Sequence, residues 1–418
     1  MRVPIALPFL LILCAGSAIS QQPQYEVSVK TVTVWVKATD DGKPVEGLKG
    51  VDFQIYEDDR LMAPTCFEEL VTPPEAVAPN LAIAPLQTPT VPAVTPILRR
   101  FVIFLDLFNT SQEEYLRVRP VILQFLEQLR GKDWDVMLVD VLPNGKMRVV
   151  APPAPDLRRI RNALLGAQGS GTRDAKARER KRLVTYFLEL AVSTGMSEVA
   201  IEKAYKLAQT YAVEEKSDAE YSLAALETLE TYLSKTAGQE HIVVLYVSGG
   251  FNGDPGRRYF DMVDRVVEGS GDAVDFSGYR LLRPWSVRDL NFDLQSEVRK
   301  SIGKLNRKNI TVYAINTRGA YLPDQTGERP GAYDGNDPFV SRDYMDSMWR
   351  IAKETGGIVF ENGSDFTIGF DRVLADVSHQ YIVCYSAPAH DKPGQYHKIK
   401  VVSKRPGLEL RYRQGYVD

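Results

Sequence analysis

The sequence predicts an α/β fold in which a doubly wound, mostly parallel sheet is inserted between two β segments that form a small β-sandwich. Continuous apolar runs such as 101–105 and 241–247 are typical of parallel strands buried on both faces. Amphipathic helical patterns alternate with these runs, as expected when right-handed crossovers connect the strands of one sheet. Short, alternating strands at both ends of the chain favour a second, all-β unit.

The first twenty residues, 1–20, are typical of a secretory signal peptide. Arg2 precedes an apolar run, and small residues follow the run up to Ser20. We therefore expect an exported protein, periplasmic or secreted, with no later segment apolar enough to span a membrane. The formal net charge of -3 gives no field that would gather nucleic acid, so the expected partners are proteins or other cell-envelope or extracellular ligands.

Residues 21–70 are expected to form the N-terminal β segment. Apolar residues alternate along 25–38, and a change of phase there indicates a bulge or a strand that passes between two layers. Turn signals then separate two short strands, 53–56 and 61–67. Residues 71–98 are rich in proline, which cannot continue a helix or a central strand, so we predict an extended linker.

The inserted domain is expected over residues 99–379. The strand 101–105 comes first, a helix follows, and Asn144-Gly145 then joins two antiparallel strands in a hairpin. Residues 171–238 are long for one crossover and poor in strand formers, so we predict a helical insertion there. The remaining predicted strands are 241–247, 310–315 and 358–360, and the predicted helices are 116–129, 157–165, 290–305, 345–355 and a last one ending near 373.

The C-terminal β segment is expected over residues 380–418, where short strands are again separated by turns. We predict that it pairs with residues 21–70 to complete the sandwich. Cys66 and Cys384 lie in predicted strands of the two segments, and in an exported protein they can form a disulfide. Two unpaired, buried thiols are an equal alternative.

Several short segments, in this order, carry a resemblance to a known family: Asp41-Gly42-Lys43-Pro44-Val45, Leu105-Asp106, Val312-Tyr313-Ala314-Ile315, Ala352-Lys353-Glu354-Thr355-Gly356-Gly357 and Lys404-Arg405-Pro406-Gly407-Leu408. The chain resembles the bacterial VWFA-related family of exported proteins, whose members join an N-terminal β segment, a divergent von Willebrand factor A domain and a C-terminal β segment. The resemblance implies a von Willebrand factor A-like sheet that binds other macromolecules.

The same resemblance implies a metal-ion-dependent adhesion site at the carboxyl ends of the central strands, here in degenerate form. Asp106 matches the first carboxylate, Thr110 replaces a hydroxyl ligand, and Thr172 is the candidate loop threonine. Phe108 stands where another hydroxyl belongs, and Gly249 replaces a distant aspartate. Mg²⁺ or Mn²⁺ would be the ion for such oxygen ligands. Without a metal, Asp106 is expected to bond neighbouring loop amides while Phe108 packs the crevice.

The leading hypothesis is an exported, non-catalytic protein-interaction or adhesion module. Its partner-binding crevice is expected to comprise Asp106, Phe108, Asn109, Thr110, Thr172, Ser248 and Gly249. A metal-dependent receptor using Mg²⁺ or Mn²⁺ and a hydrolase are the alternatives. The sequence contains no zinc-protease helix motif, nucleophile elbow or Walker loop, so no catalytic residue is assigned. The basic run from Arg173 to Arg182 is interpreted as a solvated helix face.

Overall fold

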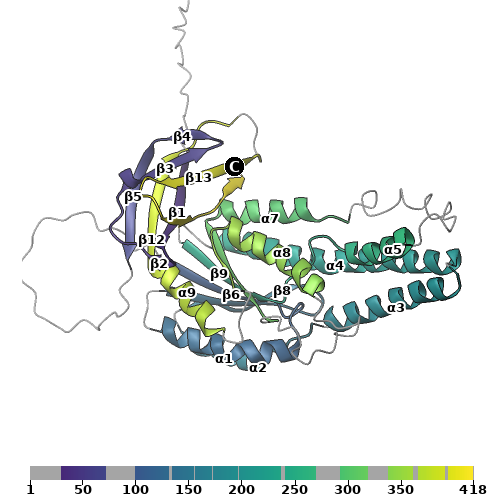
Figure 1. The fold of residues 1–418 in the computed structure, drawn as a ribbon. Helices are drawn as coiled ribbons and strands as arrows, with labels where there is room; N and C mark the ends of the chain where they lie inside the picture. The colour runs from purple at the N-terminus through teal and green to yellow at the C-terminus, as the bar shows by residue number, and fades with distance from the viewer. Residues whose placement is uncertain are drawn as a thin grey trace, which may run out of the picture.

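The computed structural model consists of an α/β unit and a β-sandwich that lies against one end of it (Figure 1). It describes residues 30–71, 99–130, 134–154, 156–171, 173–195, 197–236, 241–269, 292–318, 338–360, 366–390 and 394–417. The signal peptide and the linker expected at residues 1–20 and 71–98 lie outside these ranges, apart from Val71. Within them, no helix combines the length and apolarity needed to cross a bilayer.

The sandwich is built from the first and the last described segments of the chain. In one sheet the strand order is β14-β1-β12-β5, with β2 paired to β1, and in the other it is β15-β13-β3-β4. The strands are β1 (Thr31–Asp40), β2 (Lys43–Pro44), β3 (Phe53–Glu57), β4 (Arg60–Met62), β5 (Pro64–Val71), β12 (His379–Ser386), β13 (Tyr396–Ser403), β14 (Glu409–Arg411) and β15 (Gly415–Val417); a 3₁₀ turn, η1 (Gly50–Asp52), precedes β3. Val34 faces Val383 across the antiparallel pair β1 and β12, and both sheets contribute to one apolar core.

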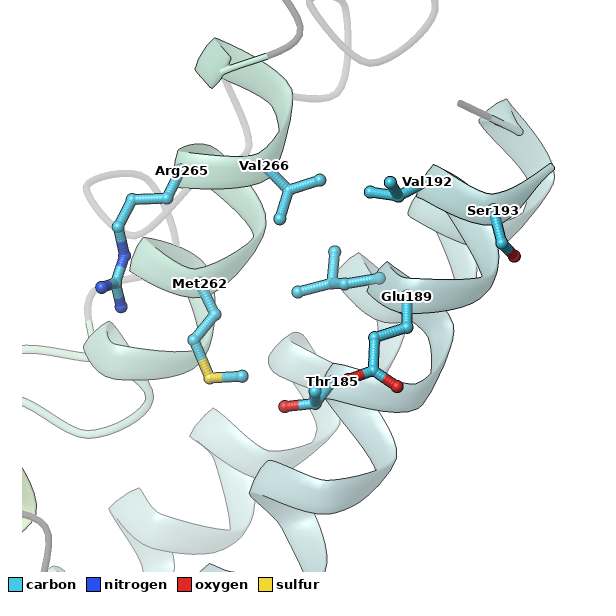
Figure 2. A pocket seen from close by; sticks show the side chains of 8 residues that line it. Thr185, Glu189, Val192, Ser193, Met262, Arg265 and Val266 are labelled. Carbon is cyan, nitrogen blue, oxygen red and sulfur yellow. The ribbon is translucent and has the colours of Figure 1, made fainter. Parts of the chain in front are cut away.

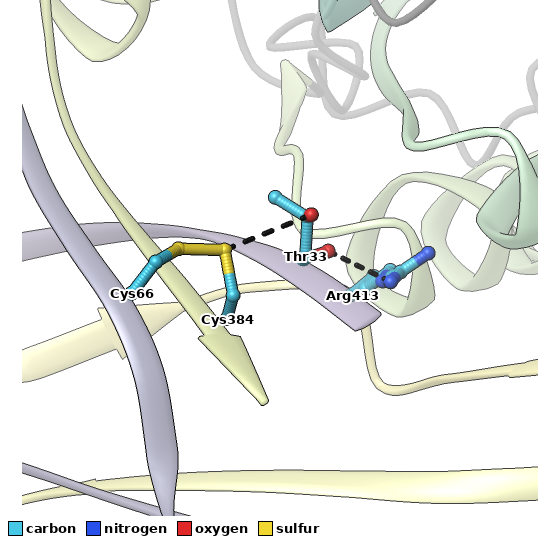
Figure 3. Close-up of a disulfide and its surroundings, with 4 residues drawn as sticks. All are labelled: Thr33, Cys66, Cys384 and Arg413. Carbon is cyan, nitrogen blue, oxygen red and sulfur yellow. Dashed lines mark hydrogen bonds between the residues drawn. A yellow bond between two sulfur atoms is a disulfide. The ribbon is translucent and has the colours of Figure 1, made fainter. Parts of the chain in front are cut away.

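A disulfide joins Cys66 in β5 to Cys384 in β12 (Figure 3). The two residues are direct partners in the antiparallel register of these strands, with Cα atoms 4.9 Å apart. The Thr33 hydroxyl, on β1, lies 3.8 Å from the Cys384 sulfur. Of the two alternatives that the sequence left open, the structure therefore contains the pair that ties β5 to the last third of the chain.

The α/β unit contains a sheet with the order β11-β10-β9-β6-β7-β8 among the described residues. Neighbouring strands run parallel except β8, which is antiparallel to β7 and completes the hairpin predicted at Asn144-Gly145. The strands are β6 (Arg99–Leu105), β7 (Trp134–Val141), β8 (Met147–Ala154), β9 (His241–Ser248), β10 (Ile310–Asn316) and β11 (Val359–Phe360). Every residue of β6 is buried, because helices cover both faces of the sheet at this strand.

The helices divide between the two faces of this sheet (Figure 1). They are α1 (Gln112–Leu129), α2 (Arg158–Gly166), α3 (Arg173–Ser193), α4 (Glu198–Thr236), α5 (Arg257–Gly269), α7 (Gln295–Arg307), α8 (Pro338–Glu354) and α9 (Thr367–Ser378). One face packs against α1, α2 and α9, and the other against α7, α8 and part of α4. The α7 helix begins five residues later than the sequence predicted, and α8 begins seven residues earlier.

The 39-residue helix α4 has two different packing partners along its length. Its second half, from Ala219 to Leu233, packs on the sheet with α7 and α8. Its first half, from Ala200 to Ala212, packs against α3 and α5 and carries a stripe of alanines that lets these helices approach closely. The predicted insertion 171–238 is therefore helical, but its last part belongs to the core of the α/β unit.

Strand β1 also connects the sandwich to the α/β unit. Trp35 stacks on His241, the first residue of β9, with ring centroids 4.1 Å apart. Two residues on, Lys37 is buried, and its Nζ donates to the Gly356 carbonyl at 3.0 Å. This contact explains why β1 is buried on both faces after Thr33 instead of alternating to solvent.

The buried Lys37 makes stability depend on pH. Burial, assisted by nearby Arg411, lowers its pKa from 10.5 to about 7, while Asp376 opposes this shift. The unfolded chain therefore holds the Lys37 proton more tightly, so folding stability is lower below pH 7 and rises towards pH 10.5. Lys37→Met is expected to raise the free energy of unfolding at pH 6 and to flatten that rise.

Urea denaturation at a series of pH values measures this effect. Lys43→Met, which replaces an exposed lysine on β2, is the matched control and should keep the wild-type pH dependence. Loss of stability at pH 6 in Lys37→Met would show instead that the buried ammonium is a net stabilising group.

Candidate functional site

Asp106 follows β6 at the carboxyl end of the sheet, where the sequence predicted the adhesion site. Its Oδ2 accepts hydrogen bonds from the Ser248 hydroxyl at 2.7 Å, the Tyr246 hydroxyl at 2.9 Å and the Asn109 amide at 2.8 Å. Its Oδ1 accepts from the Asn109 backbone N–H at 3.2 Å. The carboxylate is thus held by donors from its own loop and from β9.

Helix α4 covers this end of the sheet. The Asn109 amide also donates to Ser222 of α4 at 2.7 Å, and the Phe108 ring meets the edge of Tyr221 with centroids 5.9 Å apart. Tyr221 also packs on the hairpin turn at Gly145, where a Cβ atom would lie 2.6 Å from it and where φ is positive. The loop side chains are consequently held beneath α4.

Five of the seven predicted crevice residues are buried, Phe108 is half-buried, and Thr172 lies outside the described residues, so the open surface expected from sequence is not seen at these five. Asp106 and Thr110 are each 1% exposed and Ser248 is 0% exposed, with Asn109 and Gly249 also buried. The Ser248 hydroxyl is itself engaged, since it donates to Asp106 and accepts from the Gly250 N–H. Sequence reasoning missed the cover because the prediction of a helical insertion at 171–238 does not say where its helices pack.

Two of the three proposed metal ligands, Asp106 and Thr110, lie in the described part of the chain. A Mg²⁺ or Mn²⁺ shell requires several oxygen lone pairs directed at the ion, whereas Asp106 is surrounded by hydrogen-bond donors. The Thr110 hydroxyl is buried and has no hydrogen-bond partner in the described part of the chain, Asp106 included. Thr172 lies outside the described residues. The hydrogen-bond donors around Asp106 thus occupy the carboxylate that the predicted metal site would use.

An apolar groove lies elsewhere, between α3 and α5 (Figure 2). These two helices and the first half of α4 pack together, and we call them the helical projection. Its volume is about 510 Å³. Side chains from the two helices face each other across it: Thr185, Leu188, Glu189, Val192 and Ser193 from α3, and Met262, Arg265 and Val266 from α5. The first four lining positions follow the i, i+3, i+4, i+7 spacing of one helix face. Sequence reasoning missed the groove because its two walls, α3 and α5, are separated in the sequence by the whole of α4 and by β9.

A buried ion network holds this projection to the loop after β9. Glu215 of α4 accepts from the Gly256 N–H at 2.9 Å, pairs with Arg258, and lies 3.7 Å from Arg180. Tyr259 donates to the same carboxylate at 3.1 Å. Arg180 belongs to the basic run predicted as a solvated face, but it is 5% exposed because it turns inward to these acids.

Comparisons with known proteins give limited information. No protein-family model matches the chain, and no curated protein matches it. Among solved structures, the conserved hypothetical protein BatB from Bacteroides thetaiotaomicron is similar, with 9% sequence identity and a TM-score of 0.28. The match covers 67% of this chain and 98% of that one. This is a distant structural neighbour, and a likeness at that level shows neither family nor activity.

Proposed function

We propose that this protein is an exported, non-catalytic interaction module that binds an amphipathic helix of a partner protein in the groove between α3 and α5. The observation that carries the proposal is the groove itself, where the apolar side chains of two neighbouring helices leave room between them. Helix-in-groove recognition uses this arrangement, since a third helix can bury its own apolar face there.

The exposure of the groove supports this proposal. Val192, which lines the groove, is 56% exposed. Leu188 also lines the groove and belongs to the core shared by α3, α4 and α5, so the floor of the groove is packed against neighbouring helices. Burying an exposed valine contributes about 1.5–3 kcal/mol, which makes this surface a favourable contact.

Two charged side chains lie at the margins of the groove. Glu189 comes from α3 and Arg265 from α5, so the two walls carry opposite charges. We infer that the partner helix carries an acidic residue on the side of its apolar stripe that faces Arg265. Such charges select the orientation of the bound helix more than they raise its affinity.

The proposal includes two further statements, that the protein is exported and that its α/β unit is von Willebrand factor A-like. The disulfide between Cys66 and Cys384 supports an extracytoplasmic location, because such bonds persist in oxidising compartments. The parallel strands β7, β6, β9, β10 and β11 with an antiparallel edge strand support the von Willebrand factor A-like assignment. In this proposal the partner meets the helical projection instead of the carboxyl end of the sheet.

Site-specific photocrosslinking tests this function. A photoreactive amino acid at Val192 is expected to capture a partner protein in cells that export the chain. The same group at Val213, which is 58% exposed on α4 and does not line the groove, should not capture it. The crosslinked partner peptide should be an amphipathic helix. Equal capture at both positions, or no adduct at Val192, would refute the proposal.

The synthetic partner peptide then allows a quantitative prediction. Val192→Glu and Val266→Asp should each weaken its binding about tenfold to one hundredfold, because each buries a charge in place of apolar contact. Val213→Glu is the matched control and should leave the dissociation constant unchanged. Adducts formed with the chain's own residues 270–291 would instead mean that an internal segment occupies the groove, and would count against the proposal.

A further inference from the structure

Three potential metal ligands meet in the β-sandwich, away from both sites described above. Glu57 ends β3, His390 follows β12, and His397 lies in β13. One ligand atom of each residue lies within 4.8 Å of the other two. Glu57 and His397 are 2% and 5% exposed, so the fold places a carboxylate and an imidazole together in its interior.

The Glu57 carboxylate is fixed by its neighbours. Its Oε2 accepts from the Tyr385 hydroxyl at 2.5 Å and the Tyr416 hydroxyl at 3.0 Å. Its Oε1 faces the histidines and lies 2.9 Å from His390 Nε2. The two tyrosines therefore orient the carboxylate and leave one oxygen directed at the imidazoles.

A second carboxylate orients His397. Its Nδ1 lies 2.8 Å from Asp58 Oδ2, and because a carboxylate accepts, Nδ1 carries the proton. The Lys398 N–H holds the other Asp58 oxygen at 2.8 Å. In the neutral ring the lone pair is consequently on Nε2. A carboxylate that binds the far nitrogen in this way is the usual support of a metal-binding histidine.

The two imidazoles lie face to face, with ring centroids 3.5 Å apart and an angle of 12° between the planes. The lone pair of an imidazole nitrogen lies in the plane of its ring. Two parallel, stacked rings therefore do not direct their lone pairs at one ion, and one ring must tilt to complete the site. His390 is the ring that can do so, since it lies beyond the end of β12, whereas His397 is held within β13.

We propose that Glu57, His390 and His397 bind a divalent transition-metal ion of the Zn²⁺ type. Two imidazole nitrogens with one carboxylate oxygen suit Zn²⁺, whereas Mg²⁺ and Ca²⁺ prefer all-oxygen shells. The ion takes the place of the proton that His390 Nε2 shares with Glu57, and that proton leaves to solvent or moves to Nδ1 of the same ring. A fourth position remains for water or another donor.

Metal titration of the purified, disulfide-bonded chain tests the site. After treatment with a chelator, the protein is expected to bind one equivalent of Zn²⁺ with a rise in melting temperature. Co²⁺ should bind in its place and show the visible absorption of a four-coordinate nitrogen and oxygen site. His390→Gln and His397→Gln should abolish this stoichiometric binding, and Asp58→Asn should weaken it about 10–100-fold.

His379→Gln is the matched control, because His379 lies in the same sandwich and pairs with Glu69 at 2.9 Å without joining this cluster. It should bind Zn²⁺ like the wild type. Unchanged Zn²⁺ stoichiometry in His390→Gln, or no saturable binding in the wild type, would overturn the proposal. Since His390 lies outside the strands, its variant keeps the test valid even if His397→Gln fails to fold.

Discussion

Glu215→Gln is expected to lower the free energy of unfolding by about 3–5 kcal/mol, because it leaves a buried guanidinium without its counter-charge. Arg258 pairs with Glu215 and otherwise contacts the neutral hydroxyls of Tyr259 and Tyr344. The side chains of Glu215 and Arg258 are 3% and 11% exposed, so water solvates the remaining guanidinium poorly. The loss should appear in urea denaturation and, by hydrogen exchange, first in α3–α5 and the loop after β9.

Glu214→Gln provides the matched control for this prediction. Glu214 pairs with Arg180 at 2.7 Å, but its side chain is 50% exposed. An ion pair of this kind contributes about 0–1 kcal/mol. Equal stabilities of Glu215→Gln and the wild type would show that the buried carboxylate is not required as a counter-charge. Because the groove lies on the anchored helices, Glu215→Gln should also weaken binding of the partner helix.

Removal of the disulfide by Cys66→Ser/Cys384→Ser is expected to lower the free energy of unfolding by about 2–4 kcal/mol. The cysteines are 318 residues apart in sequence, so the bond removes much of the freedom of the unfolded chain. In the folded state β5 and β12 are already paired, and their register should survive the substitution. Denaturation with and without reductant measures the effect.

Reductant serves as the internal control for this second prediction. It should destabilise the wild type by the same amount as the double substitution and leave the double variant unchanged. If the double variant equals the oxidised wild type in stability, the bond does not restrict the unfolded chain as argued here.

Local patterns were sufficient where neighbouring residues decide the structure. The run 101–105 lies within β6, and Asn144-Gly145 makes the turn between β7 and β8. The bonds that Asp106 accepts from its neighbouring loop residue Asn109 were also expected from the position of Asp106 at the end of a strand. Each of these features depends on the burial period of one strand or on the backbone preferences of one turn.

Patterns failed where one element has two roles. The helical composition of 171–238 indicated an insertion, but it did not indicate that the second half of α4 packs on the sheet and covers Asp106. The alternating-strand pattern also did not indicate that Lys37 of β1 would be buried against Gly356. In both cases the burial depends on which distant segment packs against α4 or Lys37 in the folded protein. The sequence of one segment does not contain that information.

The sequence by itself determined the kinds of element, their order and the presence of two cysteines that can pair, because these follow from periodicity, turn chemistry and composition. The tertiary structure decided which surfaces are open. It buried most of the predicted crevice residues beneath α4, opened a groove between α3 and α5, and brought Glu57 within 2.9 Å of His390 across 333 residues of sequence. Such contacts arise from packing between distant segments, and no local pattern carries that information.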